Sequence, residues 1–398
     1  MKISKVECHA LLVPNYAPEA CSSAQDDIVV EVHTDEGLTG IGEVDTNPWA
    51  VASLIKSPGS HVLARSLEEI LVGCDPLDTE ALWEKMYVGS LMAGRRGAGI
   101  CAMGAIDMAL WDLRGKILGL PCWKLLGGAR KDAVIPYASL LPAGYNVAEQ
   151  RESLMAMVQA ARTMGFRAAK LEVCFMGPYA HNGVQGSRQD IVGTVAACRD
   201  AVGPDFTLML DVCYGWDNAK EALRALHDLE PYNLYFVETP LRLDDLRGYA
   251  YLHDHSPIRI AAGELQNGRF EFRQLMDEGK IDVAQPDIGR VGGLTEARRV
   301  CDMAGDRGVQ IVPHCWKSAI GIMASLHLAI GVAHCPFIEF LPAPLSGSRL
   351  RQELVLNEPE LQNGALALPD APGLGVKLNR KALDIFSADA QEVYALNR

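Results

Sequence analysis

Six ionisable residues follow apolar runs in the second half of the chain at nearly even spacing. They are Asp211, Glu238, Glu264, Asp287, His314 and Glu339. Successive members lie between 23 (287 − 264) and 27 (238 − 211) positions apart, the length of a strand followed by a helix. Parallel strands of a barrel bring their carboxyl ends to one rim, which is the catalytic face of such barrels. We therefore expect the six side chains to meet at that rim.

Three of these residues, Asp211, Glu238 and Glu264, are carboxylates on successive units. A single acid at such a position is more often solvated or caps a helix. Three acids in a dry site repel one another unless they take up protons or a cation. Carboxylate oxygens suit a hard divalent cation in octahedral geometry. The sequence thus predicts a metal site for Mg²⁺, with Mn²⁺ as the alternative.

Lys170 and Glu172 lie in the run Ala-Ala-Lys-Leu-Glu. Alternate residues of a strand face the same side, so both should point into the barrel. A lysine beside a metal can have its pKa lowered and serve as a base. The alternative is a structural ion pair between Lys170 and Glu172.

His314 follows Val-Pro one unit after Asp287. A carboxylate on the neighbouring strand can fix the tautomer of an imidazole and stabilise its charged form. A histidine in such a position is a candidate general acid or base, rather than a structural histidine.

Short apolar runs alternate with amphipathic helices from about residue 134 onward. This alternation, repeated eight times, predicts an α/β fold with a parallel sheet closed as a TIM-type barrel. A doubly wound open sheet is the alternative. The expected strands are Val134–Ser139, Ala168–Val173, Thr207–Val212, Leu234–Glu238, Ile258–Glu264, Ile281–Gln285, Gln310–Pro313 and Phe337–Phe340. A loop from Cys174 to Arg188, rich in glycine, interrupts the second unit.

The first part of the chain has a different pattern, that of a small α+β unit. Ile28–Val32 and Leu38–Glu43 read as two strands joined by a turn at Gly37. Apolar residues recur at steps of three and four from Ala102 to Leu118, which predicts a helix. Gly119 and Pro121 should end it.

The chain has 398 residues and a net charge of −13. Nucleic acid and anionic membranes would be repelled, whereas a small anionic substrate could still bind beside a metal. The N-terminal residues show no secretory signal, and the apolar stretch Ala319–Ala333 is too short to span a bilayer. The eleven cysteines form no CxxC pair, so we expect buried thiols in a reducing cytoplasm rather than a disulfide or zinc framework.

Several motifs together resemble the enolase superfamily, specifically the mandelate racemase subgroup of the mandelate racemase/muconate lactonizing enzyme family. They are the run from Ala102 to Lys116 leading to Leu-Leu-Gly127, Val-Glu238-Thr-Pro, Ala-Gly-Glu264, Gln-Pro-Asp287-Ile-Gly-Arg-Val-Gly-Gly, Val-Pro-His314 and Ile-Glu339-Phe. The resemblance spans essentially the whole chain. It implies a capping domain over residues 1–130, a modified (β/α)₇β barrel over 131–370, and a C-terminal tail over 371–398 that returns to the cap.

The resemblance also implies roles. Asp211, Glu238 and Glu264 would hold the metal, Asp287 and His314 would form the acid–base dyad, and Glu339 would hydrogen-bond the reaction intermediate. The reaction would begin by abstraction of the proton α to a carboxylate, giving an enediolate stabilised by the metal. The substrate would be a small carboxylate, and the resemblance suggests a homo-oligomer.

One position departs from the subgroup. Its second-strand motif is Lys-x-Lys, and Glu172 stands where the second lysine is expected. This departure argues against a racemase with a base on each face of the substrate. The inserted loop and the stretch Leu210-Asp211-Val-Cys-Tyr-Gly-Trp resemble the rhamnonate dehydratase branch, which favours a sugar-acid dehydratase. Alternatives are a racemase or epimerase of an α-hydroxy acid or amino-acid derivative, and an inactive ligand-binding homologue. Specificity is expected from segments 13–27 and 47–59, the loop around His181, and Trp316 and Lys317.

Overall fold

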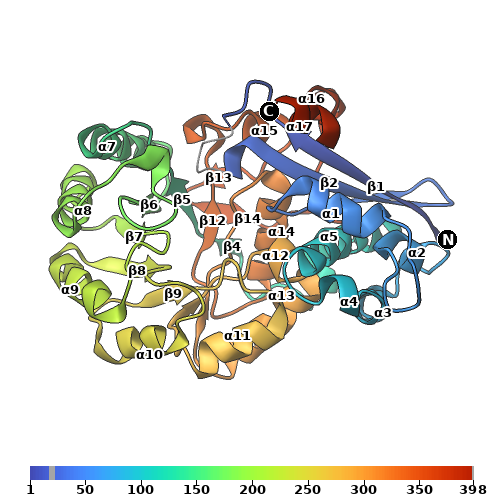
Figure 1. Cartoon of the computed structure of the whole chain (residues 1–398), viewed down its shortest axis with the longest axis horizontal. Helices are drawn as coiled ribbons and strands as arrows, with labels where there is room; N and C mark the ends of the chain where they lie inside the picture. The colour runs from blue at the N-terminus through green and yellow to red at the C-terminus, as the bar shows by residue number, and fades with distance from the viewer. Residues whose placement is uncertain (18–22, 397–398) are drawn as a thin grey trace.

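The N-terminal unit combines an antiparallel sheet with a group of helices. The computed structural model describes residues 1–17 and 23–396 (Figure 1). The sheet has the order β1-β2-β3, with β1 (Ile3–Leu12), β2 (Asp26–Thr34) and β3 (Thr39–Glu43). The helices are α1 (Pro48–Lys56), α2 (Leu67–Leu71), α3 (Thr79–Gly89), α4 (Leu91–Gly94), α5 (Ala98–Leu118) and α6 (Cys122–Leu125). The predicted α+β unit is confirmed, and β1 is an additional strand.

Helix α5 is the centre of this unit and is buried on nearly every side. Two glycines of β3 let the sheet approach it closely, because a Cβ atom at Gly40 or Gly42 would lie 2.0 Å from the carbonyl oxygen of Ala109 or Ala105. The helix ends at Gly119, which adopts the left-handed conformation with φ 68°. The sequence predicted both this helix and its end.

Eight parallel strands form the second sheet. They are β5 (Pro136–Leu140), β6 (Ala168–Glu172), β7 (Thr207–Asp211), β8 (Leu234–Glu238), β9 (Ile260–Ala262), β10 (Val283–Ala284), β11 (Gln310–Ile311) and β12 (Ile338–Phe340). Their order is β11-β10-β9-β8-β7-β6-β5-β12, so the last strand pairs with the first. The amide of Glu339 also donates to the carbonyl of Pro313, 3.3 Å away, which joins β12 to the chain after β11. The sheet is therefore a barrel and not an open sheet.

Seven connections between these strands carry a main helix, which gives the (β/α)₇β arrangement. The helices are α7 (Val147–Thr163), α8 (Arg188–Val202), α9 (Ala219–Leu229), α10 (Leu246–His255), α11 (Gly268–Asp277), α13 (Leu294–Gly305) and α14 (Ala319–Ile330), with the short α12 (Ile288–Val291) before α13. Figure 1 shows α7 to α11 curving around the strands, while the N-terminal unit lies on the side of α12 and α13. Inside the barrel, apolar side chains from successive strands fill the space. They are Tyr137, Ala168, Met209, Phe236, Ala261, Val283 and Val312.

Helix α14 contains the most apolar stretch of the sequence, and all its residues are buried. It packs against the barrel and the N-terminal unit. Among the residues described, no helix is both long enough and apolar enough to cross a membrane.

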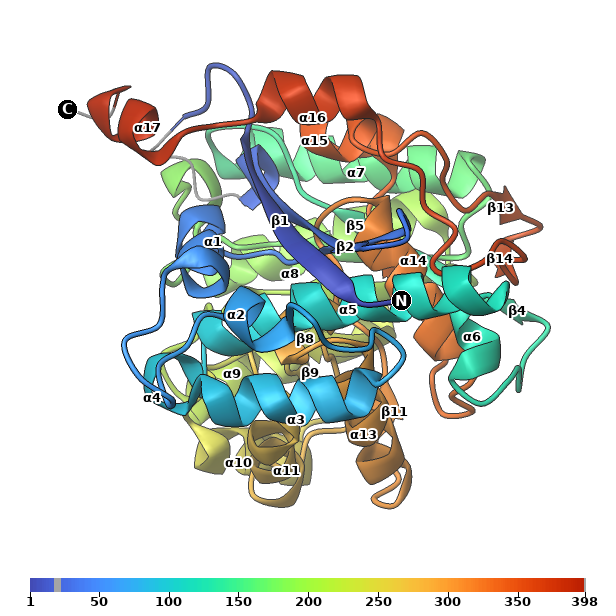
Figure 2. The ribbon, with the colours of Figure 1, turned by 90° about the vertical axis from the view of Figure 1, so that its right-hand side faces the viewer.

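The C-terminal tail returns to the N-terminal unit, as Figure 2 shows for α16 beside β1. The amide of Leu374 donates to Asp112 in α5 (2.8 Å), and the amide of Ala388 donates to the carbonyl of Ala10 (2.9 Å). Arg380 holds both carboxylate oxygens of the buried Glu31. Strand β4 (Ala133–Val134) precedes the barrel. After the barrel come α15 (Arg349–Glu353), β13 (Leu361–Gln362), β14 (Ala365–Ala367), α16 (Arg380–Phe386) and α17 (Ala390–Leu396).

Candidate active site

The predicted site residues lie at the carboxyl ends of consecutive barrel strands. Glu172, Asp211 and Glu238 are register partners at the ends of β6, β7 and β8. The remaining members stand at or just beyond the ends of β9, β10, β11 and β12, namely Glu264, Asp287, His314 and Glu339. A cavity of about 290 Å³ opens among them, lined by residues that include Glu172, His181, Asp211, Glu264 and His314. The side chains therefore lie on one rim of the barrel, as their spacing in the sequence predicted.

Asp211 and Glu238 lie together and are both buried. Oδ1 of Asp211 accepts hydrogen bonds from the Thr239 hydroxyl (2.7 Å) and the Cys213 amide (2.8 Å). Oε2 of Glu238 accepts from Gln285 (2.6 Å), whereas its buried Oε1 has no hydrogen-bond partner. Burial raises the pKa of Asp211 to about 6 and that of Glu238 to about 8, because the neighbouring carboxylates add to the loss of solvent. Both observations fit residues that hold a cation.

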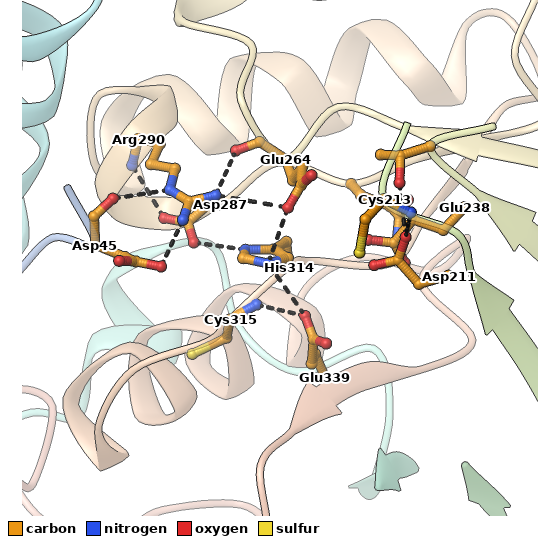
Figure 3. A network of polar contacts seen from close by, with 12 residues as sticks. Asp45, Asp211, Cys213, Glu238, Glu264, Asp287, Arg290, His314, Cys315 and Glu339 are labelled. Carbon is orange, nitrogen blue, oxygen red and sulfur yellow. Dashed lines mark hydrogen bonds and ion pairs between the residues drawn. The ribbon is translucent and has the colours of Figure 1, made fainter. Parts of the chain in front are cut away.

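Glu264 faces the other half of the site (Figure 3). Its Oε1 accepts a hydrogen bond from the Tyr214 hydroxyl (2.6 Å). Its Oε2 lies 3.3 Å from Nε2 of His314 and 3.6 Å from Arg290. The potential ligand atoms of Asp211, Glu238 and Glu264 do not all lie within 4.8 Å of one another. The triad is therefore absent from the close groups of three or more metal-ligating side chains found in residues 1–17 and 23–396. The three carboxylates lie on the same rim, and their oxygen atoms suit a hard divalent cation. In this structure, however, Glu264 is turned towards His314 and Arg290.

Strained backbone follows both β7 and β8. Cys213, Tyr214 and Thr239 have φ of 47°, 61° and 44°, in the left-handed region that residues other than glycine rarely adopt. Thr239 is β-branched, which makes this conformation more costly. The strained residues aim the Thr239 hydroxyl and the Cys213 amide at Asp211, so the strain serves to orient a candidate metal ligand.

Lys170 is the central cation of the barrel mouth. Its Nζ lies 2.8 Å from both Glu238 and Glu339 and 3.7 Å from Asp211. Burial by itself would lower the pKa of Lys170, but these carboxylates hold it well above its usual value.

Glu172 does not pair with Lys170, so the alternative of a structural Lys170–Glu172 ion pair is wrong. Its Oε2 instead lies 2.8 Å from Nε2 of His181, a residue of the inserted loop. The partners of both strand residues come from other elements, which a local pattern could not reveal. The loop folds back over the barrel mouth, so His181 is buried and lines the cavity.

Asp287 and His314 are joined as predicted, with Nδ1 of the imidazole 2.8 Å from Oδ2 of the carboxylate. Nε2 of His314 faces Glu264 (3.3 Å) and Glu339 (3.8 Å). Burial lowers the pKa of His314, but Glu339 and Asp287 outweigh it and raise the value to about 9. The arrangement fixes Nδ1 on Asp287 and leaves Nε2 as the atom that faces the site.

Glu339 is ionised and surrounded by donors. It accepts hydrogen bonds from the Ser139 hydroxyl (2.7 Å) and the Cys315 amide (2.8 Å). Burial favours its neutral form, but Lys170 and His314 lower its pKa to about 2. A carboxylate in this state accepts hydrogen bonds and balances the charge of Lys170 and His314.

Several residues of the site were not predicted, although they lie in motifs beside predicted ones. They are Tyr214, Thr239, Gln285 and Arg290. Arg290 connects the barrel to the N-terminal unit, because it contacts both Glu264 and Asp45. Its proximity to Asp287 in the sequence was a usable signal, whereas its partner Asp45 comes from 245 positions away.

The cysteine prediction was wrong at one place, where Cys174 and Cys213 form a disulfide. They lie 39 positions apart in the sequence. Each stands two residues beyond a member of the register pair Glu172–Asp211, which brings them together in space. The pairing of the two cysteines follows from the register between β6 and β7, which the spacing of cysteines in the sequence does not reveal.

The segments expected to set specificity line a second, larger cavity. It has a volume of about 600 Å³, lies between the N-terminal unit and the barrel, and shares Leu265 and Arg290 with the smaller cavity. Tyr16, Gln25 and Trp49 line it. Residues 18–22 of the predicted segment 13–27 are outside the described residues. Trp316 lines the smaller cavity, and Lys317 pairs with Asp26 (3.1 Å) and Asp45 (3.0 Å), so Lys317 ties the cap to the barrel.

Known proteins resemble the whole chain. The D-galactarolactone cycloisomerase of Agrobacterium fabrum is 31% identical over 97% of this chain and 99% of its own length. The L-rhamnonate dehydratase of Saccharopolyspora erythraea is 32% identical over 88% of this chain and 83% of its own. Among solved structures, the 3,6-anhydro-D-galactonate cycloisomerase of Zobellia galactanivorans superposes with a TM-score of 0.85, with 30% identity over 98% of this chain and 100% of that one.

A racemase of Streptomyces coelicolor A3(2), solved with bound magnesium, superposes with a TM-score of 0.81 at 26% identity, covering 97% of this chain and all of that one (100%). Two family profiles also match. Residues 9–127 match the mandelate racemase / muconate lactonizing enzyme N-terminal domain, and residues 153–382 match the enolase C-terminal domain-like family. The chain therefore belongs to the mandelate racemase/muconate lactonizing enzyme family of the enolase superfamily.

Proposed function

We propose that this chain is a Mg²⁺-dependent dehydratase of a small sugar acid, an aldonate or an aldarate. It would remove the proton α to the carboxylate and expel the 3-hydroxyl group as water, leaving a 2-keto-3-deoxy acid. The observation that carries this proposal is the contact between His314 and Asp287, with Nε2 facing the carboxylate cluster. That geometry supplies one well-oriented group for proton transfer beside candidate metal ligands.

Asp211, Glu238 and Glu264 would hold the divalent cation, which supplies positive charge to stabilise the enediolate formed from the substrate's carboxylate. Two observations support this role. Oε1 of Glu238 is buried without a hydrogen-bond partner, and the pKa values of Asp211 and Glu238 are raised, as expected for clustered carboxylates whose negative charge a cation would balance. The magnesium in the structure of the related racemase is a further support.

His314 would handle the protons at its Nε2 atom. The C2–H bond breaks as Nε2 takes the proton, and the C3–O bond breaks as a proton is delivered to the leaving hydroxyl. Asp287 keeps the imidazole in the required tautomer, while Glu339 balances the charge on the imidazolium. The enol that remains takes a solvent proton at C3 to become the keto acid.

Lys170 would bind and orient rather than act as a base. Its ammonium group lies between Glu238 and Glu339, and its pKa is held well above the usual value. In this arrangement Lys170 holds the two carboxylates in position across the barrel mouth.

A specific contact favours a second candidate, a racemase or epimerase. His181 and Glu172 form a carboxylate–histidine pair on the cavity wall, 2.8 Å apart, on the β6 side. The Asp287–His314 dyad follows β10 and β11, on another side of the barrel mouth. Two proton-transfer groups on separate sides of a substrate are what inversion at the α-carbon needs. A cycloisomerase that starts from the same enediolate is a related possibility, because two of the similar proteins bear that name.

A panel of aldonic and aldaric acids with Mg²⁺ tests the proposal. We expect at least one acid to yield a 2-keto acid, trapped as its semicarbazone, and the yield to vanish with a chelator and return with Mg²⁺. A change in the configuration at C2 without keto acid would identify the epimerase. A panel with no reaction of either kind, although the chain binds Mg²⁺, would contradict both assignments and leave a ligand-binding homologue.

A further inference from the structure

Among the described residues, the larger of two close groups of potential metal ligands does not contain the carboxylate triad. It consists of Glu172, Cys174, His181 and Cys213. Each contributes a potential ligand atom, and all four atoms lie within 4.8 Å of one another. Glu172, Cys174 and His181 are buried and Cys213 is partly exposed. None of the four belongs to the triad of Asp211, Glu238 and Glu264.

The four side chains come from three segments that meet at the barrel mouth. Glu172 ends β6, and Cys174 follows it by two residues. Cys213 follows the end of β7 by two residues, and His181 comes from the inserted loop. The register pairing of Glu172 with Asp211 fixes the two cysteines side by side, with Cα atoms 5.7 Å apart. The cluster is thus built on the barrel itself and closed by the loop.

The composition of the cluster is that of a tetrahedral zinc site. Two sulfurs, an imidazole and a carboxylate are all ligands that Zn²⁺ takes in proteins. A disulfide by itself needs no imidazole or carboxylate beside it, yet His181 and Glu172 are held against this pair by their own hydrogen bond of 2.8 Å. Thiolates select thiophilic cations, whereas the triad offers only oxygen ligands, which select hard ones.

We propose that Glu172, Cys174, His181 and Cys213 form a second metal site, for a thiophilic divalent cation such as Zn²⁺, in the state where the Cys174–Cys213 disulfide is reduced. The inference goes beyond the proposed dehydratase activity and does not depend on it. Because two sulfurs on one tetrahedral zinc ion stand about 3.8 Å apart, the disulfide and the metal exclude each other. The cluster would therefore hold either a sulfur–sulfur bond or a cation.

Conversion of the disulfide state into the metal-bound state needs a reductant and releases protons. An external dithiol gives two electrons and two protons to the disulfide and becomes a cyclic disulfide itself, while Cys174 and Cys213 become thiols. The cation then displaces the two thiol protons into solvent. Cys213 lines the smaller cavity, so a small reductant has a route to the pair. Since the Cys213 amide donates to Asp211, the state of the cluster would also affect a candidate ligand of the triad.

Cobalt absorption spectroscopy on the full chain tests the proposal. The chain is first reduced with a phosphine, and the reductant is then removed. Excess Mg²⁺ is added to occupy the triad, and the sample is titrated with Co²⁺ in the absence of oxygen. We expect sulfur-to-cobalt charge-transfer bands and tetrahedral visible bands that saturate near one equivalent of Co²⁺ and disappear on adding Zn²⁺. The oxidised chain should show neither band. A reduced chain without charge-transfer bands overturns the proposal.

Variants locate the cation. Cys174→Ser and Cys213→Ser should each weaken Co²⁺ binding by at least about 10-fold and reduce the charge-transfer intensity, because each removes a thiolate. His181→Asn should weaken binding while leaving that intensity in place. Cys198→Ser, a buried thiol of α8 outside the cluster, is the matched control and should bind as the unaltered chain does. Bands that survive both cysteine variants unchanged contradict the proposal.

A second measurement needs no variant and so is independent of their folding. The reduced chain is alkylated under native conditions with and without Zn²⁺, and the modified cysteines are identified by mass spectrometry. We expect Zn²⁺ to protect the partly exposed Cys213 selectively, while Cys8 and Cys74, which are also partly exposed, react equally in both samples. Equal alkylation of Cys213 with and without Zn²⁺ would overturn the assignment.

Discussion

Nδ1 of His314 lies 2.8 Å from Oδ2 of Asp287, and the two residues follow the neighbouring strands β11 and β10 of the barrel. Asp287 is also the N-cap of α12, accepting the amide of Arg290 at 3.0 Å. One oxygen of the carboxylate is therefore held by the first turn of α12, while the other oxygen orients the imidazole. This relationship makes His314 the best-positioned proton-transfer group on the rim.

Replacing His314 tests that role directly. We expect His314→Asn to lower kcat by about 100- to 10,000-fold on any acid that the chain converts, because a positioned acid–base group contributes that much. Metal-induced stabilisation should remain, since the carboxylate triad is intact. Steady-state kinetics with a thermal melt in Mg²⁺ measure both. His255→Asn, at an exposed residue bonded within its own helix, is the control, and equal kinetics for the two variants would exclude His314 from the chemistry.

Removing the cation should cost stability as well as activity. A ligand present at about 100 times its Kd stabilises the state that binds it by about 2.7 kcal/mol. We expect Mg²⁺ to raise the melting temperature of the unaltered chain and to have little effect on Glu238→Gln. Asp277→Asn, in an exposed pair with Arg307, should respond to Mg²⁺ as the unaltered chain does. A magnesium response that persists in Glu238→Gln would place the cation elsewhere.

Thr239 is a positioning residue for Asp211. Its hydroxyl donates to Oδ1 of Asp211 at 2.7 Å from a backbone with φ of 44°. Partners behind a metal ligand typically change metal affinity by about 10- to 100-fold when lost. Thr239→Val should therefore raise the Kd for Mg²⁺ by that factor, and Thr239→Ser should restore it.

Calorimetric titration with Mg²⁺ gives these affinities. The control is Thr163→Val, at a hydroxyl bonded to its own helix on the surface. If Thr239→Ser binds Mg²⁺ as weakly as Thr239→Val, the hydroxyl is not the cause.

His327 predicts a pH dependence of stability away from the site. It is buried in α14, accepts a hydrogen bond from the Trp123 amide (3.1 Å) and lies 3.3 Å from the carbonyl of Leu374. Burial lowers its pKa to about 4. Because the folded pKa is below the unfolded value of about 6.5, the unfolded chain binds more protons between these two values. Stability supplied by the neutral imidazole is present above pH 6.5 and lost as the pH falls towards 4.

The expected loss from this residue is about 3 kcal/mol of the free energy of unfolding across that window. Urea unfolding at several pH values measures it. In His327→Gln this contribution should be absent, so the difference in stability between variant and unaltered chain should shrink as the pH falls from 6.5 to 4. A difference that stays constant with pH would mean that the pKa of His327 is the same in the folded and the unfolded chain, which would contradict the prediction.

The sequence predicted the barrel and the rim residues because both depend on a repeated local pattern. Apolar runs marked the eight strands, and the residues after them had to reach the same face. The predicted strands were somewhat longer than those found, since residues such as Glu264 and His314 lie beyond the last ladder bonds. The capping helix and its stop at Gly119 were likewise local features.

Pairings across the barrel could not be predicted in this way. Lys170 pairs with Glu238 and Glu339, and Glu172 with His181, because the barrel closes and the loop folds inward. Arg290 finds Asp45 only when the cap docks. These partners depend on tertiary structure, and no spacing along the chain encodes them.

The most direct test of the proposed reaction is a proton NMR experiment on the acid panel in D₂O with Mg²⁺. We predict that a converted acid yields a 2-keto-3-deoxy product carrying solvent deuterium at C3, and that His314→Asn abolishes its formation. Deuterium at C2 of a recovered or inverted acid, without keto product, would contradict dehydration and support the epimerase. Unchanged spectra for the whole panel, with Mg²⁺ shown to be bound, would contradict the account as a whole.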